Sequence, residues 1–282
     1  MKFNFIQTFF KGLCVGGTML VPGVSGGSMA MILGEYDRLV SSVSSFMKHK
    51  KESALFLCIF ALGGGAGMVA FANPIQKLIA MFPLPMMYFF IGAVAGGVPL
   101  MYQKARVARF SWKSALWLLA GVAVVLLLNL LPTGLLSAGN ILEERDMMGY
   151  GIMVAAGFIA AIALILPGIS VSYMLLIMGI YDPVMQAIGG LHFSVLLPLG
   201  VGLVLGIVLT TRILEIMMNR YPGATYMVIL GFVIGSIIYV FPGLPAGIWW
   251  VWCLAALAAG FVIIRLLSAG EEKCGARETI NR

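Results

Sequence analysis

Two related motifs hold the residue types in this chain that are best suited to binding chemistry. The first spans residues 22–28 (Pro-Gly-Val-Ser-Gly-Gly-Ser), and the second spans residues 167–172 (Pro-Gly-Ile-Ser-Val-Ser). Each motif joins a Pro-Gly pair, which interrupts a helix, to a Ser that can cap the next helix. The free N–H groups and the dipole at such a helix start, together with the hydroxyls, favour an anion.

We therefore expect the two motifs to hold an anionic group between them, without a metal or other cofactor. Two glycines in the first motif would let a ligand approach the backbone closely. The plainer alternative is that each motif is only a kink whose serines bond to helix carbonyls. Two copies in one register, at a constant offset of 145 residues, favour binding. The predicted ligand-binding residues are Ser25, Gly26, Gly27, Ser28, Ser170, Ser172 and Arg212.

A second group of candidates is ionisable. Arg212 and Glu215 lie three residues apart in apolar sequence and share a helix face. At membrane depth such residues are functional candidates, although an interfacial anchor with a local ion pair would explain them equally well. Asp37 and Asp182 end two short apolar legs. Coupling to a proton or sodium ion, gating, and simple solvation of a helix end are open roles for these carboxylates.

Composition places the whole chain in a membrane. Of its 282 residues 61% are hydrophobic and only 10% are charged, and the mean hydropathy is +1.03. Soluble domains are about 45–50% apolar, so the bilayer must be the solvent. The net charge of +7 comes from Lys and Arg in short loops, which set topology and do not indicate a nucleic-acid partner. We expect a single membrane domain over residues 1–282 with no cleavable signal peptide.

The positions of the motifs suggest an internal duplication, with repeat 1 at about 5–131 and repeat 2 at about 149–267. After each Pro-Gly pair the second leg, from Ser25 to Tyr36 or from Ser170 to Tyr181, is too short to cross a core of about 30 Å. We therefore predict an all-α membrane protein in which each half has a re-entrant helical hairpin and three transmembrane helices. A loop is expected at residues 73–74. The predicted crossings are about 53–72, 85–101, 115–131, 194–211, 226–241 and 248–267.

An odd number of crossings per half predicts that the two halves insert in opposite orientations. Such an inverted-topology repeat is common among secondary transporters, which bind their substrates between the halves. With the N-terminus in the cytoplasm, all but two of the 18 Lys and Arg residues, Lys77 and Arg145, fall on the cytoplasmic side. This agrees with the positive-inside rule and predicts that both termini are cytoplasmic.

The first motif, followed by Leu33-Gly34-Glu35-Tyr36-Asp37, resembles the bacterial polyprenyl-phosphate transporter family, formerly domain of unknown function 368. The second copy, with Gly179-Ile180-Tyr181-Asp182, extends the resemblance over essentially the full chain. The resemblance implies an inner-membrane flippase that returns undecaprenyl phosphate, a carrier of cell-wall precursors, from the outer to the cytoplasmic leaflet. Alternating access about the two hairpins is the expected mechanism, with membrane lipids around the polyprenyl tail.

Two other functions fit parts of the sequence. A membrane phosphatase acting on polyprenyl diphosphates could use similar hairpins, but it needs an acid, a base or a metal ligand at the motifs. Neither motif contains Arg, His or an acidic residue. A transporter of a small soluble anion would use the same donors without a lipid tail.

Overall fold

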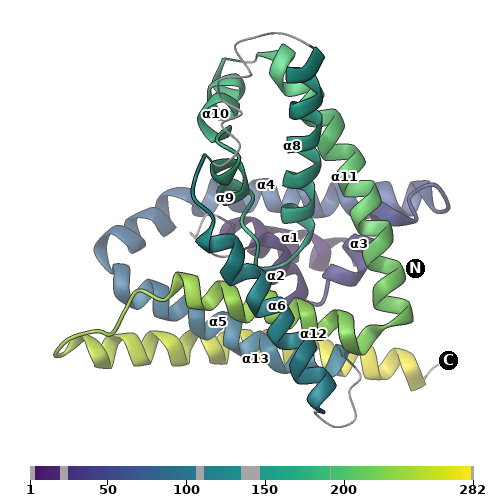
Figure 1. The fold of residues 1–282 in the computed structure, drawn as a ribbon. Helices are drawn as coiled ribbons and strands as arrows, with labels where there is room; N and C mark the ends of the chain where they lie inside the picture. Colours follow the sequence, from purple (N-terminus) through teal and green to yellow (C-terminus); the bar gives the residue numbers. More distant parts are fainter. Residues whose placement is uncertain (1–3, 20–24, 106–110, 135–146, 191, 281–282) are drawn as a thin grey trace.

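The computed structural model describes the chain except residues 1–3, 20–24, 106–110, 135–146, 191 and 281–282. The described residues form α-helices joined by turns and short loops, with no β-strand among them (Figure 1). The helices are α1 (Phe5–Thr18), α2 (Gly26–Ile32), α3 (Tyr36–Ser44), α4 (Lys50–Met81), α5 (Pro83–Lys104), α6 (Trp112–Leu130), α8 (Met147–Ile165), α9 (Val171–Ile177), α10 (Tyr181–Gly189), α11 (Phe193–Arg220), α12 (Pro222–Val240) and α13 (Trp249–Ile280).

Each repeat opens with three helices where two legs were expected. α1 is followed by the short α2 and then by α3, and α8, α9 and α10 repeat this order. Gly34 (φ 74°) and Gly179 (φ 72°) end the short helices in the left-handed conformation, which glycine adopts at low cost. The prediction of one leg from Ser25 to Tyr36 is therefore wrong, because Tyr36 begins α3. α9 and α10 are bent by 118° at the corresponding break.

The long helices extend beyond the predicted crossings. α4 continues as one helix through Pro74, where the sequence predicted a loop. Pro74 lacks one N–H group, but a loop there would leave several backbone groups without partners in hydrocarbon. The chain breaks instead at Phe82 and Tyr221, each followed by a proline in the first turn of the next helix. Proline is tolerated at that position because its missing N–H would have had no helical partner.

Helix pairing follows the sequence repeat. α1 packs along α4 as α8 packs along α11, and α5 packs along α13 as α12 packs along α6. The contacts agree at equivalent residues: a methyl group on Gly63 would collide with the Phe9 carbonyl, and one on Gly202 would collide with the Val154 carbonyl. Small residues let helix backbones approach this closely inside a membrane. The duplication seen in the sequence is therefore also present in the packing.

Two of these helix pairs join one half to the other. Gly92 of α5 lies against Leu257 of α13, and Gly231 of α12 lies against Leu118 of α6. Each of these two pairs therefore contains one helix from each half. Neither repeat packs as a separate body, which the sequence did not predict. The opposite orientation of the two halves in the bilayer stays a prediction.

The short helix α2 is enclosed by protein. Its residues Met29, Ala30, Met31 and Ile32 are each 5% exposed or less, and they form one core with side chains of α5, α11 and α12. Gly97 of α5 leaves the space that the Ile32 side chain occupies. Irregular backbone at membrane depth must be buried in protein or line a polar cavity. α2, which follows the first motif, is buried in protein in this way.

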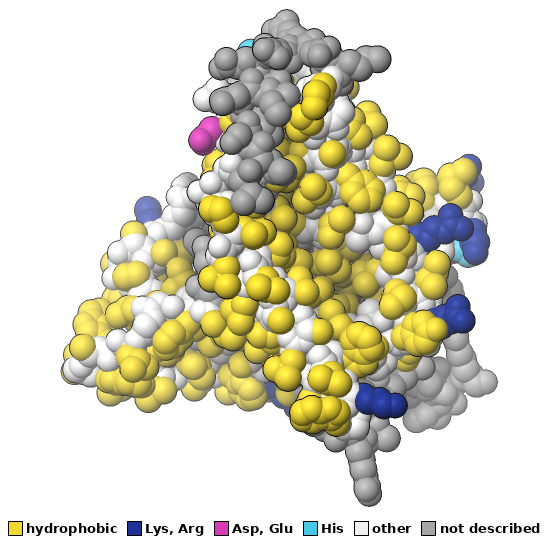
Figure 2. Space-filling view, viewed as in Figure 1, with side chains coloured by type: hydrophobic (Ala, Val, Ile, Leu, Met, Phe, Trp, Pro, Cys, Tyr) yellow, Lys and Arg dark blue, Asp and Glu magenta, His cyan; other side chains and the backbone are white. Residues whose placement is uncertain are grey.

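The described helices suit a membrane. Six of them are long and apolar enough to span one, and the bent pair α9 and α10 would be a seventh span if counted together. Hydrophobic side chains cover most of the face shown in Figure 2, while Lys and Arg lie mainly along the edge near both termini in Figure 1. The protein is therefore an all-helical, multi-pass membrane protein, as predicted.

The contact between α1 and α4 yields a stability prediction. Gly63→Ala should lower the free energy of unfolding by about 1–3 kcal/mol, because the added methyl group strikes the Phe9 carbonyl. Gly65→Ala on the same helix is the control, since nothing lies within 4 Å of the added methyl group. It should be neutral or stabilise by up to about 1 kcal/mol through helix propensity. Thermal unfolding in detergent measures both variants, and equal losses in the two would contradict the close approach.

Candidate functional site

The first motif forms the start of α2. Ser25 is the N-cap residue, but its side chain makes no capping hydrogen bond, so the predicted capping is wrong. Gly26 and Gly27 form the first turn, and residues 22–24 lie outside the described residues. The Ser28 side chain is 2% exposed, and its Oγ has no hydrogen-bond partner in the described part of the chain. A buried hydroxyl without a partner costs free energy, so Ser28 is the clearest candidate for a ligand contact.

The second motif follows α8 and is more open. Pro167 is fully buried, and Gly168 has a φ of 86°, a conformation that favours glycine. Ser170 caps α9 as predicted, accepting a hydrogen bond from the Tyr173 N–H at 3.4 Å. The side chains of Ser170 and Ser172 are both exposed. The serines of the second motif therefore differ in environment from the buried Ser28.

The two motifs meet inside the molecule. A Cβ atom on Gly27 would lie 3.4 Å from the Ile165 carbonyl oxygen, from the Pro167 Cα and from the Ser25 Oγ. The Tyr36 hydroxyl donates a hydrogen bond to the same Ile165 carbonyl at 2.8 Å. Ile165 lies in the last turn of α8, where carbonyls lack helical partners. The helix break in the second motif thus frees a carbonyl that the first hairpin satisfies.

An apolar pocket of about 620 Å³ adjoins this junction. It lies between α6, α8, α11 and α12, where the surface in Figure 2 is hollowed. Leu166, which lines it, directly precedes Pro167, and the backbone of Phe232, which also lines it, lies against Gly168. The volume is within the range of about 300–1,000 Å³ that is typical of ligand sites. A long apolar chain could occupy this pocket while a polar head lies at the motifs.

Arg212 and Glu215 do not form the local ion pair of the interfacial-anchor alternative. Glu215 is half-buried and accepts a hydrogen bond from the Ser44 hydroxyl of α3. Arg212 is exposed on α11, and in the described part of the chain it forms no ion pair with Glu215 and no hydrogen bond with either motif. The helix thus directs the carboxylate towards α3 and the guanidinium towards the surface.

Two ion pairs that the sequence did not predict hold the start of α3. Lys11 Nζ lies 2.8 Å from Glu35 Oε1, and Lys104 Nζ lies 2.8 Å from Asp37 Oδ2. Asp37 and Asp182 begin α3 and α10, so the prediction that they end the short legs is wrong. Acidic residues in a first turn interact favourably with the helix dipole. A lone lysine at position 11 inside an apolar helix was the available signal for the first pair.

Metal ligands do not gather in the part of the chain that the structure describes. No group of three or more His, Cys, Asp or Glu side chains there could hold a metal ion. The cysteines of the described helices, Cys14, Cys58 and Cys253, are free thiols.

The hydrogen bond between the motifs can be tested through Tyr36. Tyr36→Phe should lower the free energy of unfolding by about 1 kcal/mol, because it leaves the Ile165 carbonyl without its 2.8 Å donor. Tyr181→Phe changes the equivalent residue of the second half, whose hydroxyl makes no hydrogen bond in the described part of the chain, and should be neutral. Thermal unfolding of the two variants side by side checks this difference. A larger loss in Tyr181→Phe would show that the bond does not hold the motifs together.

The Lys11–Glu35 pair makes a second stability prediction. The side chains are only 16% and 9% exposed, and removing one partner of a buried pair costs about 3–5 kcal/mol. Glu35→Ile should therefore destabilise strongly. The double variant Lys11→Ala with Glu35→Ile should recover most of the loss, because it copies Ala156 and Ile180 of the second half. Equal stability of the single and double variants, measured by thermal unfolding, would show that the two residues do not interact.

Comparison with known proteins places this site in context. The chain matches the model of the undecaprenyl phosphate translocase-like family over residues 15–249, which include both motifs. It is 34% identical over 271 residues to a polyprenyl-phosphate transporter of Staphylococcus aureus, covering 93% of this chain and 95% of that protein. It is 31% identical over 259 residues to a polyprenyl-phosphate transporter of Vibrio cholerae, covering 85% and 78%. No solved structure matches the chain.

Proposed function

This chain belongs to the undecaprenyl phosphate translocase-like family, and on that premise we propose that it carries undecaprenyl phosphate across the bacterial inner membrane. Its relatives of similar length are polyprenyl-phosphate transporters, so the protein is a transporter and not an enzyme. The lipid moves from the outer to the cytoplasmic leaflet, where it can again carry cell-envelope precursors. Both termini lie in the cytoplasm, on the side towards which most Lys and Arg residues are predicted to face.

The phosphate binds where the two motifs meet. The observation that carries this proposal is the buried Ser28 hydroxyl, which has no partner in the described part of the chain. A phosphate oxygen would supply the missing acceptor, and hydrogen bonds to charged groups are stronger than those between neutral groups. Ser25 lies beside Gly27 at the same junction and adds a second hydroxyl. The exposed Ser170 and Ser172 form the outer part of this site.

The polyprenyl tail occupies the apolar pocket beside the second motif. That pocket is lined almost entirely by hydrophobic side chains from four helices, and it begins next to Pro167. A lipid phosphate needs both a site for its compact anionic head and an apolar route for its tail. The adjacent junction and pocket provide the two environments in one place.

Transport proceeds by alternating access, with a gate beside α3. Three polar contacts hold α3 to its neighbours: Lys11–Glu35 at 2.8 Å, Lys104–Asp37 at 2.8 Å and Ser44–Glu215. These contacts must open before the head group can leave beside α3. Asp37 and Glu215 therefore act as gating residues, whether a proton gradient, a sodium gradient or the lipid gradient drives transport.

The set of positions related to these contacts by the repeat lacks most of the groups that form them. The positions equivalent to Lys11, Glu35, Lys104, Ser44 and Glu215 carry Ala156, Ile180, Gly243, Gly189 and Gln76. Only the position equivalent to Asp37 keeps a charged residue, Asp182. This difference supports a gate on the α3 side that is held by charges and a gate on the α10 side that is not.

Transport should depend on Ser28. In liposomes with fluorescent undecaprenyl phosphate, Ser28→Ala should slow movement between leaflets by about tenfold, the loss of one charge-assisted hydrogen bond. Thermal stability should be unchanged or higher, because the hydroxyl has no protein partner to lose. Ser236→Ala is the matched control, since the buried Ser236 Oγ donates to the Val233 carbonyl at 2.8 Å. It should lose some stability and keep its transport rate.

The same assay tests Arg212, which we propose attracts the phosphate towards the site from the surface of α11. Arg212→Ala should slow transport at low salt, and Arg212→Lys should restore it.

A normal rate in Ser28→Ala would remove that residue from the site while leaving lipid transport intact. Failure of the wild-type chain to move the lipid under any imposed proton or sodium gradient would overturn the function itself.

A further inference from the structure

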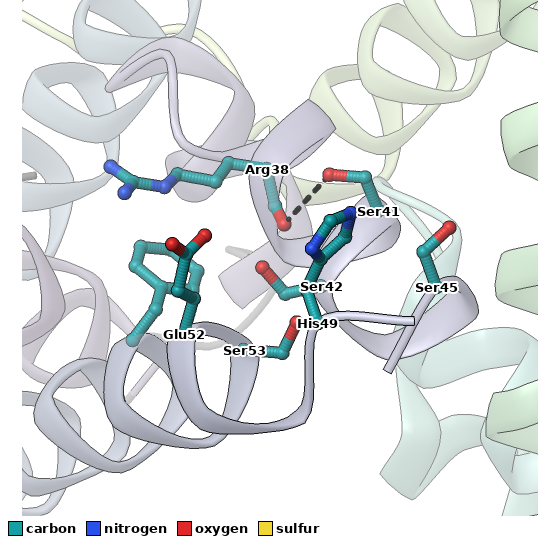
Figure 3. Close-up of a pocket in the computed structure, with 8 residues that line it drawn as sticks. Arg38, Ser41, Ser42, Ser45, His49, Glu52 and Ser53 are labelled. Atoms are coloured by element: carbon teal, nitrogen blue, oxygen red, sulfur yellow. Dashed lines mark hydrogen bonds between the residues drawn. The ribbon is translucent and has the colours of Figure 1, made fainter. Parts of the chain in front are cut away.

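A second pocket, lined by several polar and charged residues, lies outside the junction of the two motifs. It is a cavity of about 300 Å³ between α3 and the start of α4, and Figure 3 shows its lining side chains. Four of these residues are serines, and they are accompanied by one arginine, one histidine and one glutamate. The lining residues are Arg38, Ser41, Ser42, Ser45, His49, Glu52, Ser53 and Phe56.

The pocket is held in shape by packing beneath it. The Arg38 guanidinium lies 4.4 Å from the centre of the Phe56 ring, and Phe56 is only 1% exposed. A cation held over an aromatic ring is attracted by the negative face of that ring. Ser53 is 6% exposed, and the Ser41 hydroxyl donates to the Arg38 carbonyl at 3.2 Å. The Arg38 guanidinium and the Ser41 hydroxyl are therefore held in place.

The chemistry of this pocket suits a phosphate group. Serine hydroxyls and the arginine guanidinium can donate hydrogen bonds to phosphate oxygens. The start of the 32-residue helix α4 adds partial positive charge. Lys48, Lys50 and Lys51 flank His49 and raise the local positive potential. Glu52 opposes an anion and limits its affinity. A site through which a ligand passes must bind weakly enough to release it.

We propose that this pocket binds the phosphate head group of a prenyl phosphate lipid on the α3 side of the protein, as the station between the motif junction and the membrane surface. The proposal rests on the proposed function. The position of the pocket supports the proposal as well as its chemistry, because α3 connects the motif junction to the pocket. Its first residue, Tyr36, bonds to Ile165 at the junction, and its next turns carry Arg38, Ser41, Ser42 and Ser45 into the pocket.

The test measures protection of a thiol placed in the pocket. In the full chain with its four cysteines replaced by alanine, Ser45→Cys is reacted with a charged methanethiosulfonate reagent. Farnesyl phosphate should slow the reaction, whereas farnesol and equal concentrations of inorganic phosphate should do so much less. Met47→Cys, whose native side chain is 75% exposed and does not line the pocket, should stay unprotected by all three compounds.

Charge substitutions in the lining sharpen the test. Arg38→Gln should raise the half-protecting concentration of farnesyl phosphate by about tenfold or more, the loss of one charge-assisted hydrogen bond. Glu52→Gln should lower that concentration, because it removes a repulsive charge. Thermal unfolding of each variant shows that it is folded. A weaker effect of farnesyl phosphate on Glu52→Gln would overturn the proposal.

The remaining outcomes separate this inference from the proposed function. Equal protection by inorganic phosphate would identify a site for free phosphate, and equal protection by farnesol would exclude recognition of the phosphate group; either result overturns the proposal. Movement of undecaprenyl phosphate in liposomes without any protection would overturn the pocket and leave transport standing. Protection of the thiol without movement would support the pocket and overturn transport.

Discussion

The need to pair every backbone group in hydrocarbon is the constraint on which the rest of this structure depends. The chain interrupts two membrane helices with Pro-Gly motifs, and each interruption leaves carbonyls and N–H groups without helical partners. The structure answers by burying α2, which follows the first motif, and by placing the start of α2 against the second motif. The bond from Tyr36 to the Ile165 carbonyl is the direct evidence, because one hairpin there satisfies a group freed by the other. The proposed binding site lies at this junction, because polar groups can face inward only where protein excludes lipid.

Close helix packing supplies the protein that encloses the junction. Glycines at repeated positions bring α1 against α4 and α8 against α11, and the same arrangement joins α5 to α13 and α6 to α12. The two halves nevertheless differ where polar groups are concerned. The serines of the second motif are exposed, while Ser28 of the first is buried, and the ion pairs that hold α3 have no full counterpart at α10. The helix packing is thus repeated in the two halves, whereas the polar contacts are not.

The sequence was enough to predict the helical membrane fold, because long apolar segments are a local signal. It could not predict that α4 passes through Pro74, since this depends on how costly a loop would be at that depth. It placed Tyr36 and Asp37 at the end of a leg because Gly34 alone does not reveal a second helix start. The exposure of Arg212 and the pairing of Lys11 with Glu35 depend on contacts between distant segments, which spacing along one helix does not determine.

The exchange of helices between the two halves has a consequence for the order in which the protein can be made. α5 and α6 leave the ribosome well before α12 and α13, the helices that their glycine-lined faces pack against. Until α12 and α13 are synthesised, these faces must lie in lipid or beside the insertion machinery. The first half therefore cannot finish assembly by itself, and a chain that stops before α13 leaves α5 without its main partner. α6 gains its partner when α12 is made, and α5 gains its partner only when α13, the last helix, is complete.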